Sequence, residues 1–194
     1  MTKQAEDRRE DILNATLNLI EEKGVDQLRA ADLAKVLGVS SGLIFYHFDN
    51  LQTLVTSAVS YATERQMAYL ARLIEESGDD LIGRLYAVLH EYGPTGSAFG
   101  WRLWIECWSA SLRDVELRKV VQSLDAEWRG LITDIIDEGV RTGVFDCPDP
   151  AAAALRLTAL LDGLAVQYVV FDRAVTIIQI GDAMNLTLSR DLGI

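Results

Sequence analysis

Apolar residues recur along this chain mostly at the three- and four-residue spacing of amphipathic helices. Within residues 5–23, Ile12, Ala15 and Leu19 fall on one helical face, and Leu13 and Ile20 widen that face. Apolar periodicity and capping residues predict further helices at about 30–37, 41–47, 50–76, 80–92, 101–112, 114–142, 150–171 and 174–190. No segment alternates in the manner of a strand, so the sequence predicts an all-α fold of about nine helices.

Residues that begin or end helices support this division of the chain. Ser40 is a natural N-cap for the helix at 41–47, and Asn50 is one for the helix that follows. Gly38 permits a left-handed turn residue, and Asp149 followed by Pro150 is a strong helix start. The clearest loop of the chain is predicted at 93–97, where glycine, proline and serine cluster.

The composition is that of an ordinary globular protein. The chain has 194 residues, of which 49% are apolar and 24% charged, so it forms one domain or two small ones and is not disordered. Cys107 and Cys147 have no metal-ligand spacing and argue for a reducing cytoplasm rather than a disulfide framework. Residues 1–9 lack the apolar core of a signal peptide, and we expect a cytoplasmic, soluble protein.

The longest apolar stretch, residues 150–171, has about the length of a membrane-spanning helix. Arg156, Asp162 and Gln167 interrupt it, and each of these side chains is costly to place in hydrocarbon. We therefore expect a helix that is buried within the protein.

The net charge of −11 argues against a general affinity for nucleic acid. Residues 1–50 contain six Lys/Arg against nine Asp/Glu, a net charge of −3, and residues 51–194 carry the remaining −8. A DNA-binding function must therefore rest on local geometry rather than on overall charge.

Residues 29–54 have the pattern of two short helices joined by a tight turn. Ala34 is small where the helices would cross, Gly38 supplies the turn, and Val39 is placed to fill the core between the helices. Ile44 and Phe48 are expected to point inward from the second helix. This is the spacing of a helix-turn-helix, whose second helix enters the major groove of DNA. The residues left to face DNA are Ser41, Gly42, Leu43, Phe45, Tyr46 and His47.

The segment Gly-Val-Ser-Ser-Gly-Leu-Ile-Phe-Tyr-His-Phe, residues 38–48, resembles the Gly-Val-Ser-x-Gly-x-x-Tyr-x-Phe type signature of the TetR family of bacterial repressors. Asn50-Leu51-x-x-Leu54 is similar to the start of the family's fourth helix, and the chain length and helix number also match. In the C-terminal half, Trp104, Trp108 and Leu161-Asp162-Gly163-Leu164 look like the BetI-type subgroup.

The resemblance implies which residues contact DNA. Ser40, Ser41 and Gly42 match the start of the recognition helix, where hydroxyls and backbone N–H groups hold phosphates. Leu43 and Phe45 match positions that read bases or contact thymine methyl groups.

Further implied DNA contacts lie at the end of this helix and around it. Tyr46 and His47 match positions that contact the DNA backbone, and the expected set is completed by Arg29, Ala30 and Asn50. Arg29 replaces the Thr or Ser cap that the family often has, and gains a phosphate contact. Leu51 replaces a lysine that usually contacts phosphate, so we expect an affinity that depends less on salt-sensitive charge pairs.

The sequence leaves other interpretations open. Residues 29–54 form a hairpin of an ordinary helical bundle if Phe45, Tyr46 and Phe48 are core residues. A TetR-fold module that binds a ligand or protein without sequence-specific DNA binding is a second alternative, favoured by Leu51 and the acidic N-terminal part. An enzyme has no support, because the chain has two histidines, no nucleophile–base motif and no phosphate loop. We expect no cofactor and no metal site.

Trp101, Trp104, Ile105 and Trp108 share one face of the helix at 101–112. This stripe is either a wall of an effector pocket or ordinary core packing. Glu106 lies off the stripe and is expected to pair with Arg102. Four more residues are candidates for the pocket or the core: Tyr86, His90, Cys107 and Tyr168.

Asp162 is a carboxylate in a helix that is apolar on nearly all sides, and a buried carboxylate needs a partner. The candidate partners are a cationic ligand, Thr158, or an arginine across a dimer interface. On the opposite face of the same helix an apolar seam is predicted to form the dimer interface, consisting of Leu157, Leu161, Leu164 and Tyr168. We expect this helix and the helix at 174–190 to build a four-helix interface in a twofold homodimer.

These features together predict a ligand-responsive transcriptional repressor of TetR type. Residues 1–50 would bind double-stranded DNA at a palindromic operator, and residues 51–194 would dimerise and hold a small-molecule effector. The helix at 50–76 would act as the lever between them. The effector, the operator and the choice between repressor and activator stay open.

Overall fold

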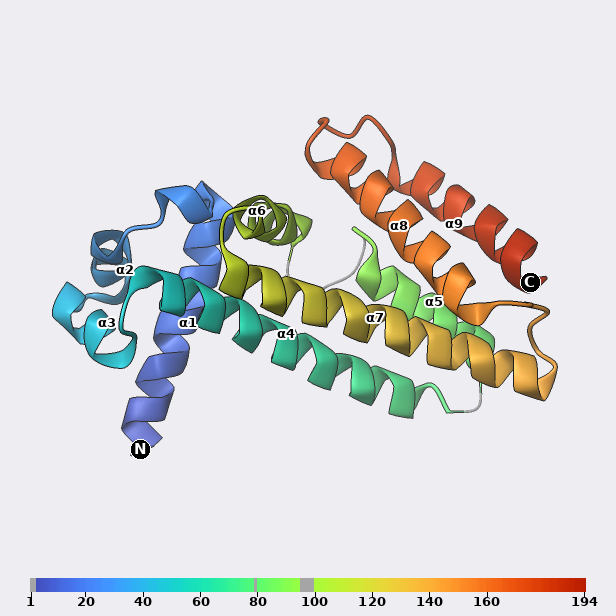
Figure 1. Cartoon of the computed structure of the whole chain (residues 1–194), viewed down its shortest axis with the longest axis horizontal. Coiled ribbons are helices and arrows are strands. Elements are labelled where there is room, and N and C mark those ends of the chain that lie inside the picture. Colours follow the sequence, from blue (N-terminus) through green and yellow to red (C-terminus); the bar gives the residue numbers. More distant parts are fainter. Residues whose placement is uncertain (1–2, 79, 95–99) are drawn as a thin grey trace. The chain divides into compact units, whose positions relative to one another are not determined.

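The computed structural model of the chain describes residues 3–78, 80–94 and 100–194 (Figure 1). The all-α prediction is confirmed, since the described residues form helices and contain no strand. The α-helices are α1 (Lys3–Lys23), α2 (Ala30–Leu37), α3 (Ser41–His47), α4 (Leu51–Glu76), α5 (Leu81–Tyr92), α6 (Trp101–Ser111), α7 (Val115–Thr142), α8 (Pro150–Val169) and α9 (Ile177–Leu192), and one 3-10 helix, η1 (Val25–Gln27), follows α1.

The predicted loop at 93–97 is described only in part, and the predicted boundaries of the last two helices differ from those of the structure. Residues 95–97 of the predicted loop lie outside the described residues. The segment between α8 and α9 is longer than expected, because α8 ends at Val169 and α9 begins at Ile177. In this segment Asp172 and Arg173 adopt left-handed backbone, with φ of 49° and 61°, which ends α8.

The chain divides into two compact units. The first contains Met1–Arg65 and Arg102–Gln122, and the second contains Gln66–Trp101 and Ser123–Ile194. This division differs from a boundary after residue 50, because α4 continues without a break from Leu51 to Glu76 and contributes to both units.

In the first unit, apolar side chains of α1 and α2 help to position α3. In α1 the predicted face is buried, with Ile12, Leu13 and Ile20 having no exposed surface. Helix α2 packs on α1, and α3 packs on α2 (Figure 1). Ile44 of α3 and Phe48 just after it are buried as predicted, at 0% and 3% exposure. Burial of two large apolar side chains orients this short helix.

Local backbone geometry and capping side chains fix where α3 and α4 begin. Gly38 has φ 65° and ψ 34°, the left-handed conformation that the turn requires. The Ser40 hydroxyl accepts a hydrogen bond from Leu43 N at 3.3 Å, and Asn50 Oδ1 accepts one from Thr53 N at 2.8 Å. The predicted caps are therefore present. Val39 is only half-buried, so it fills the core between the helices less than expected.

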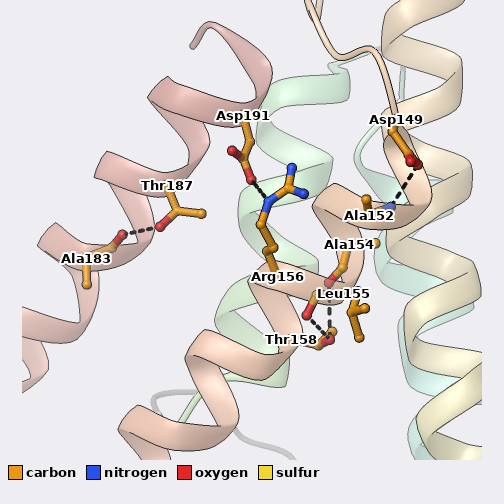
Figure 2. A network of polar contacts seen from close by, with 9 residues as sticks. All are labelled: Asp149, Ala152, Ala154, Leu155, Arg156, Thr158, Ala183, Thr187 and Asp191. Atoms are coloured by element: carbon orange, nitrogen blue, oxygen red, sulfur yellow. Dashed lines mark hydrogen bonds and ion pairs between the residues drawn. The ribbon is translucent and has the colours of Figure 1, made fainter.

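In the second unit, α8 and α9 pack side by side and run antiparallel (Figure 1). Asp149 Oδ1 caps α8 by accepting from Ala152 N at 2.9 Å, and Thr176 and Gln179 form a capping box at the start of α9. The two helices are joined by an ion pair in which Arg156 Nε lies 2.7 Å from Asp191 Oδ2 (Figure 2).

Helix α8 has the length and apolar composition that would allow it to cross a membrane, which by itself is weak evidence for a span. Within the single chain, 33% of the stretch is buried, so the expectation of a buried helix is met on part of its surface only. Leu155, at 49% exposure, belongs to the part that the single chain leaves uncovered.

Candidate functional site

Helix α3 presents aromatic side chains to solvent. Tyr46 is 81% exposed and Phe45 is 45% exposed, and the Tyr46 and His47 rings meet edge to face at a centroid distance of 5.3 Å. Of the three aromatic residues that an ordinary hairpin would place in its core, only Phe48 is buried. The hairpin interpretation is therefore wrong on this point, since a packing role does not account for Phe45 and Tyr46.

The other predicted α3 residues lie on the same short helix with partial or full exposure. Gly42 is exposed, and Ser41, Leu43 and His47 are half-buried. The Ser40 hydroxyl is occupied by its cap on Leu43 N, so Ser40 has a structural role already. The arrangement gives a helix whose buried residues hold it in place and whose remaining surface is available to a partner.

Residues flanking α3 also take up defined positions. Arg29 is exposed at the N-cap position of α2 and makes no side-chain capping bond, which fits the loss of a Thr or Ser there. Ala30 is half-buried as the first residue of α2. Asn50 is exposed and caps α4, and Leu51 is half-buried.

Arg9 is a residue near α3 that sequence reasoning missed. Its guanidinium carbon lies 5.0 Å from the centre of the Phe48 ring, a cation–π contact between α1 and the end of α3. The only signal in the sequence was a basic pair in α1, and nothing in the pattern indicated that it faces Phe48.

A second group of polar and aromatic residues includes Asp162 and lies in the second unit. Asp162 Oδ1 accepts a hydrogen bond from the Tyr92 hydroxyl at 2.7 Å. The Tyr92 ring meets Trp128 edge to face at 5.1 Å and Trp101 at 6.1 Å, and Trp101 Nε1 donates to the Tyr92 carbonyl at 3.2 Å. We call Asp162, Tyr92, Trp101 and Trp128 the Asp162 cluster.

The sequence did not predict Tyr92 and Trp128 as members of this group. It offered Thr158 as a candidate partner of Asp162. The Thr158 hydroxyl instead donates back to the carbonyls of Ala154 and Leu155, at 3.1 and 3.2 Å (Figure 2). Thr158 is therefore the wrong partner, because its hydrogen atom is used within α8. Trp128 is a buried residue of α7, at 4% exposure.

The electrostatics of the Asp162 cluster favour a carboxyl that changes charge near neutral pH. Burial raises the pKa of Asp162 to about 6, the Tyr92 hydrogen bond opposes this shift, and nearby Asp125 adds to it. Arg129, which is paired with Asp125, acts against the rise. Burial, followed by the negative charge of Asp162, raises the pKa of Tyr92 and keeps its hydroxyl protonated as a donor.

The remaining candidate ligand-binding residues do not all gather around Asp162. Tyr86 donates to Asn185 Oδ1 at 3.1 Å, while His90 Nδ1 lies 3.8 Å from Glu91 Oε1. Tyr168 is half-buried beneath the Arg173 guanidinium, 5.9 Å from its ring centre.

The tryptophan stripe is divided between the two compact units. Trp101 belongs to the second unit, and Trp104, Cys107 and Trp108 belong to the first. Trp104 and Cys107 are buried, at 8% and 0% exposure, and Trp108 is half-buried. Burial, with a smaller effect of Glu106, raises the pKa of the Cys107 thiol to about 12, which disfavours its thiolate form.

The expected ion pair between Glu106 and Arg102 is absent from the ion pairs of the described residues. The Glu106 carboxylate lies instead against Gly24, where a Cβ atom would be 2.6 Å from Glu106 Oε2. Gly24 has φ 85°, so this position favours glycine for both its backbone conformation and its close neighbour.

The predicted dimer seam needs a correction. Leu157 and Leu161 are 0% and 1% exposed within the single chain, because α8 buries them against its own neighbours. They are therefore not available to a partner, whereas Leu164 and Tyr168 are half-buried. The exposed large apolar side chains of α8 and α9 are Leu155, Ile177, Ile178 and Leu186. In the described part of the chain, no three His, Cys, Asp or Glu side chains are grouped so as to hold a metal ion.

Comparisons with known families agree with this geometry. Residues 12–58 match the model of bacterial regulatory proteins of the tetR family, and residues 82–185 match the C-terminal domain of BetI-type transcriptional repressors. The fold and the exposed helix α3 thus belong to a transcription regulator with a DNA-binding and a ligand-binding domain. The chain belongs to the TetR family and has a BetI-type C-terminal domain.

Individual relatives and solved structures extend over most of the chain. The HTH-type transcriptional regulator BetI of Stenotrophomonas maltophilia is 28% identical over 161 residues, covering 81% of this chain and 79% of that protein. A putative transcriptional regulator from Saccharomonospora viridis, solved in complex with choline, is 27% identical with a TM-score of 0.83, covering 96% and 98% of the two chains. A TetR regulator from Haloarcula marismortui shares the fold, at 21% identity and a TM-score of 0.87, over 96% of this chain and 99% of that one.

Asp162→Asn is expected to change how stability depends on pH. Because its folded-state pKa is raised from 3.8 to about 6, Asp162 stabilises the fold while protonated. This contribution is complete below about pH 4 and is lost as the pH rises through about 6. Asparagine still accepts from Tyr92 and carries no charge, so the variant should gain in melting temperature over the wild type as the pH rises from about 4 to about 7.

The matched control is Asp182→Asn, which changes an exposed carboxylate on α9. It reports the effect of removing a surface carboxylate, with which the Asp162→Asn difference in melting temperature is compared at each pH. If the difference in melting temperature between Asp162→Asn and the wild type stays constant between about pH 4 and 7, the pKa of Asp162 is not raised in the folded chain.

Proposed function

We propose that this protein is a homodimeric repressor that binds a palindromic operator through α3 and is released from it by a small-molecule effector. The observation that carries the DNA-binding part is the exposure of Phe45 and Tyr46 on a short helix whose inward residues, Ile44 and Phe48, are buried. Such a protein acts in the cytoplasm, where bacterial DNA is.

Base and sugar contacts must supply much of the operator affinity. The net charge of −3 over residues 1–50 provides few phosphate contacts, and Leu51 adds none. Phe45 and Leu43 are suited to contact thymine methyl groups, and Tyr46 and His47 are suited to donate to the sugar–phosphate backbone. Arg29, exposed at the start of α2, adds one cation. The salt dependence of operator binding should consequently be shallow for a DNA-binding protein.

A homodimer is supported by the apolar surface that α8 and α9 leave uncovered. Ile178 is 76% exposed, Leu186 53% and Leu155 49%, and they stand on two helices packed side by side. A second copy that covers these side chains buries apolar area on both partners. Two copies related by a twofold axis present two α3 helices, which is the arrangement that reads a palindrome.

The Asp162 cluster is the candidate effector site, and its chemistry suits a small organic cation. The Asp162 carboxylate accepts a hydrogen bond from Tyr92, whose ring in turn meets Trp101 and Trp128 edge to face. Aromatic rings attract a cation through their π faces, and a carboxylate supplies its counter-charge. The similar regulator from Saccharomonospora viridis was solved with choline, which is such a cation. A ligand that binds more tightly to the dimer state with wrongly spaced α3 helices releases the operator. Helix α4, which contributes to both units, is the element we propose as the lever.

Tyr46→Ala should weaken operator binding about tenfold or more, because it removes the most exposed aromatic contact of α3. The measurement is fluorescence anisotropy with operator DNA at fixed salt. Tyr69→Ala, which removes a tyrosine exposed by 37% on α4, is the matched control and should leave affinity unchanged. Equal affinity of wild type and Tyr46→Ala would remove Tyr46 from the interface.

The oligomeric state is tested by sedimentation equilibrium at micromolar concentration. The wild type should sediment at twice the chain mass of 21.5 kDa, and Ile178→Asp should shift it toward the single chain. Leu112→Asp, at a position exposed by 72% in the first unit, is the control that should stay dimeric. A wild type of 21.5 kDa would contradict the proposed homodimer.

Choline is the probe for the effector class, measured by isothermal titration calorimetry at about pH 8, where Asp162 is ionised. Asp162→Asn should weaken choline binding about tenfold or more because it removes the counter-charge, and Asp182→Asn should not. The uncharged isostere 3,3-dimethyl-1-butanol should bind much more weakly than choline. Equal binding of the two molecules, or of choline to both aspartate variants, would exclude a cation site at Asp162.

A further inference from the structure

An ion pair on α7 stands beside the Asp162 cluster. Arg129 Nη2 donates a hydrogen bond to Asp125 Oδ2, four positions earlier in the helix, and we call these two residues the α7 ion pair. Asp125 precedes Trp128 by three positions, so their side chains emerge on the same face of α7. Trp128 is a member of the Asp162 cluster, and the α7 ion pair therefore lies next to that cluster in the same compact unit.

Contacts through α5 connect α7 with the Asp162 carboxyl. The Trp128 ring meets the Tyr92 ring at a centroid distance of 5.1 Å, and the Tyr92 hydroxyl donates to Asp162 Oδ1 at 2.7 Å. Besides burial, three groups act on the Asp162 carboxyl: Tyr92 from α5 and both members of the α7 ion pair. Asp125 raises the pKa of Asp162 and Arg129 lowers it, so both charges are felt at this carboxyl.

The charged groups around Asp162 carry a net negative charge. When Asp162 is ionised, two carboxylates stand against the guanidinium of Arg129. That guanidinium serves both carboxylates, because it pairs with Asp125 and also lowers the pKa of Asp162. A ligand with one positive charge would balance the three groups, and it would have to bind in the presence of the Arg129 charge.

We infer that Arg129 is an internal competitor of the cation in the proposed effector site, and that Asp125 restrains it and so admits the ligand. The inference rests on the proposed cation site at Asp162 and adds two specificity-determining residues to it. The guanidinium and a cationic ligand repel each other, so Arg129 lowers the affinity. Asp125 acts in the opposite sense, because its carboxylate attracts the ligand and holds the guanidinium by a hydrogen bond.

Both members of the α7 ion pair can be exchanged without unfolding the chain. The side chains of Arg129 and Asp125 are 38% and 42% exposed, and a pair of this kind on one helix contributes little to stability. Glutamine at 129 and asparagine at 125 remove the charge and keep a polar side chain. The two variants therefore change the electrostatics of the site and leave its framework in place.

The test titrates choline into the full chain by isothermal titration calorimetry at about pH 8, where Asp162 is ionised. Arg129→Gln should bind choline at least about threefold more tightly than the wild type, and Asp125→Asn at least about threefold more weakly. Structural damage would weaken binding in both variants. A gain in one and a loss in the other is therefore the signature of charge.

Lys119→Gln and Glu116→Gln are the matched controls, because they make the same changes of charge in another ion pair of α7. This pair belongs to the first unit, and both variants should bind choline like the wild type. The weak binding of the uncharged isostere 3,3-dimethyl-1-butanol should be the same for the wild type and Arg129→Gln, since the repulsion acts only on a charged ligand. The gain of Arg129→Gln should also shrink in about 1 M salt, which screens partly exposed charges.

The pH dependence of choline binding gives a second measurement. Binding to the wild type should be lost as the pH falls through about 6, because Asp162 becomes protonated. Arg129→Gln raises the pKa of Asp162 further, so its binding should be lost at a higher pH than that of the wild type. Asp125→Asn lowers this pKa, and its binding should persist to a lower pH.

Failure of this inference and failure of the cation site give different results. If Asp162→Asn weakens choline binding but Arg129→Gln does not strengthen it, the inference is wrong and the cation site stands. Equal weakening by Arg129→Gln and Asp125→Asn would also overturn it, by giving the α7 ion pair a structural role. If neither the wild type nor Arg129→Gln binds choline, the cation site is wrong and the inference falls with it.

Discussion

The burial of Ile44 and Phe48 is the constraint on which the functional surface depends. With these two side chains in the core of the first unit, a helix of seven residues has one orientation, and Phe45 and Tyr46 must face solvent. The left-handed Gly38 and the Ser40 cap fix where this helix begins. Exposed aromatic side chains on a rigid, capped helix make sense as a contact surface and not as packing, which is why α3 carries the DNA-binding proposal.

The second unit combines buried polar chemistry with an uncovered apolar face. Asp162 is tolerated in an apolar helix because Tyr92 donates a hydrogen bond to it, and its burial raises its pKa to about 6. One side of α8 is buried against the rest of the chain. Leu155 on α8 and Ile178 on α9 remain exposed. The proposed ligand site and the proposed dimer interface share α8, which would couple effector binding to the spacing of two α3 helices.

Local signals in the sequence predicted the helices, the caps at Ser40, Asn50 and Asp149, and the inward residues of α3, because each depends on neighbours within a few positions. Contacts between distant segments were not predictable in the same way. Tyr92 reaches Asp162 across 70 positions, and Arg9 meets Phe48 across two helices. Leu157 and Leu161 looked like an interface, since periodicity shows that a face is apolar and not which neighbour covers it.

Sequence-specific binding by α3 is tested most directly by fluorescence anisotropy with the DNA upstream of the protein's own gene, at fixed moderate salt. We expect binding in about the nanomolar range to a palindrome in that DNA. The triple variant Ser41→Ala, Tyr46→Ala and His47→Ala should lose this binding and stay dimeric. Wild-type binding that is no tighter than binding to unrelated DNA, there and in a search of the whole genome, would contradict the operator-binding role and leave a ligand-binding module.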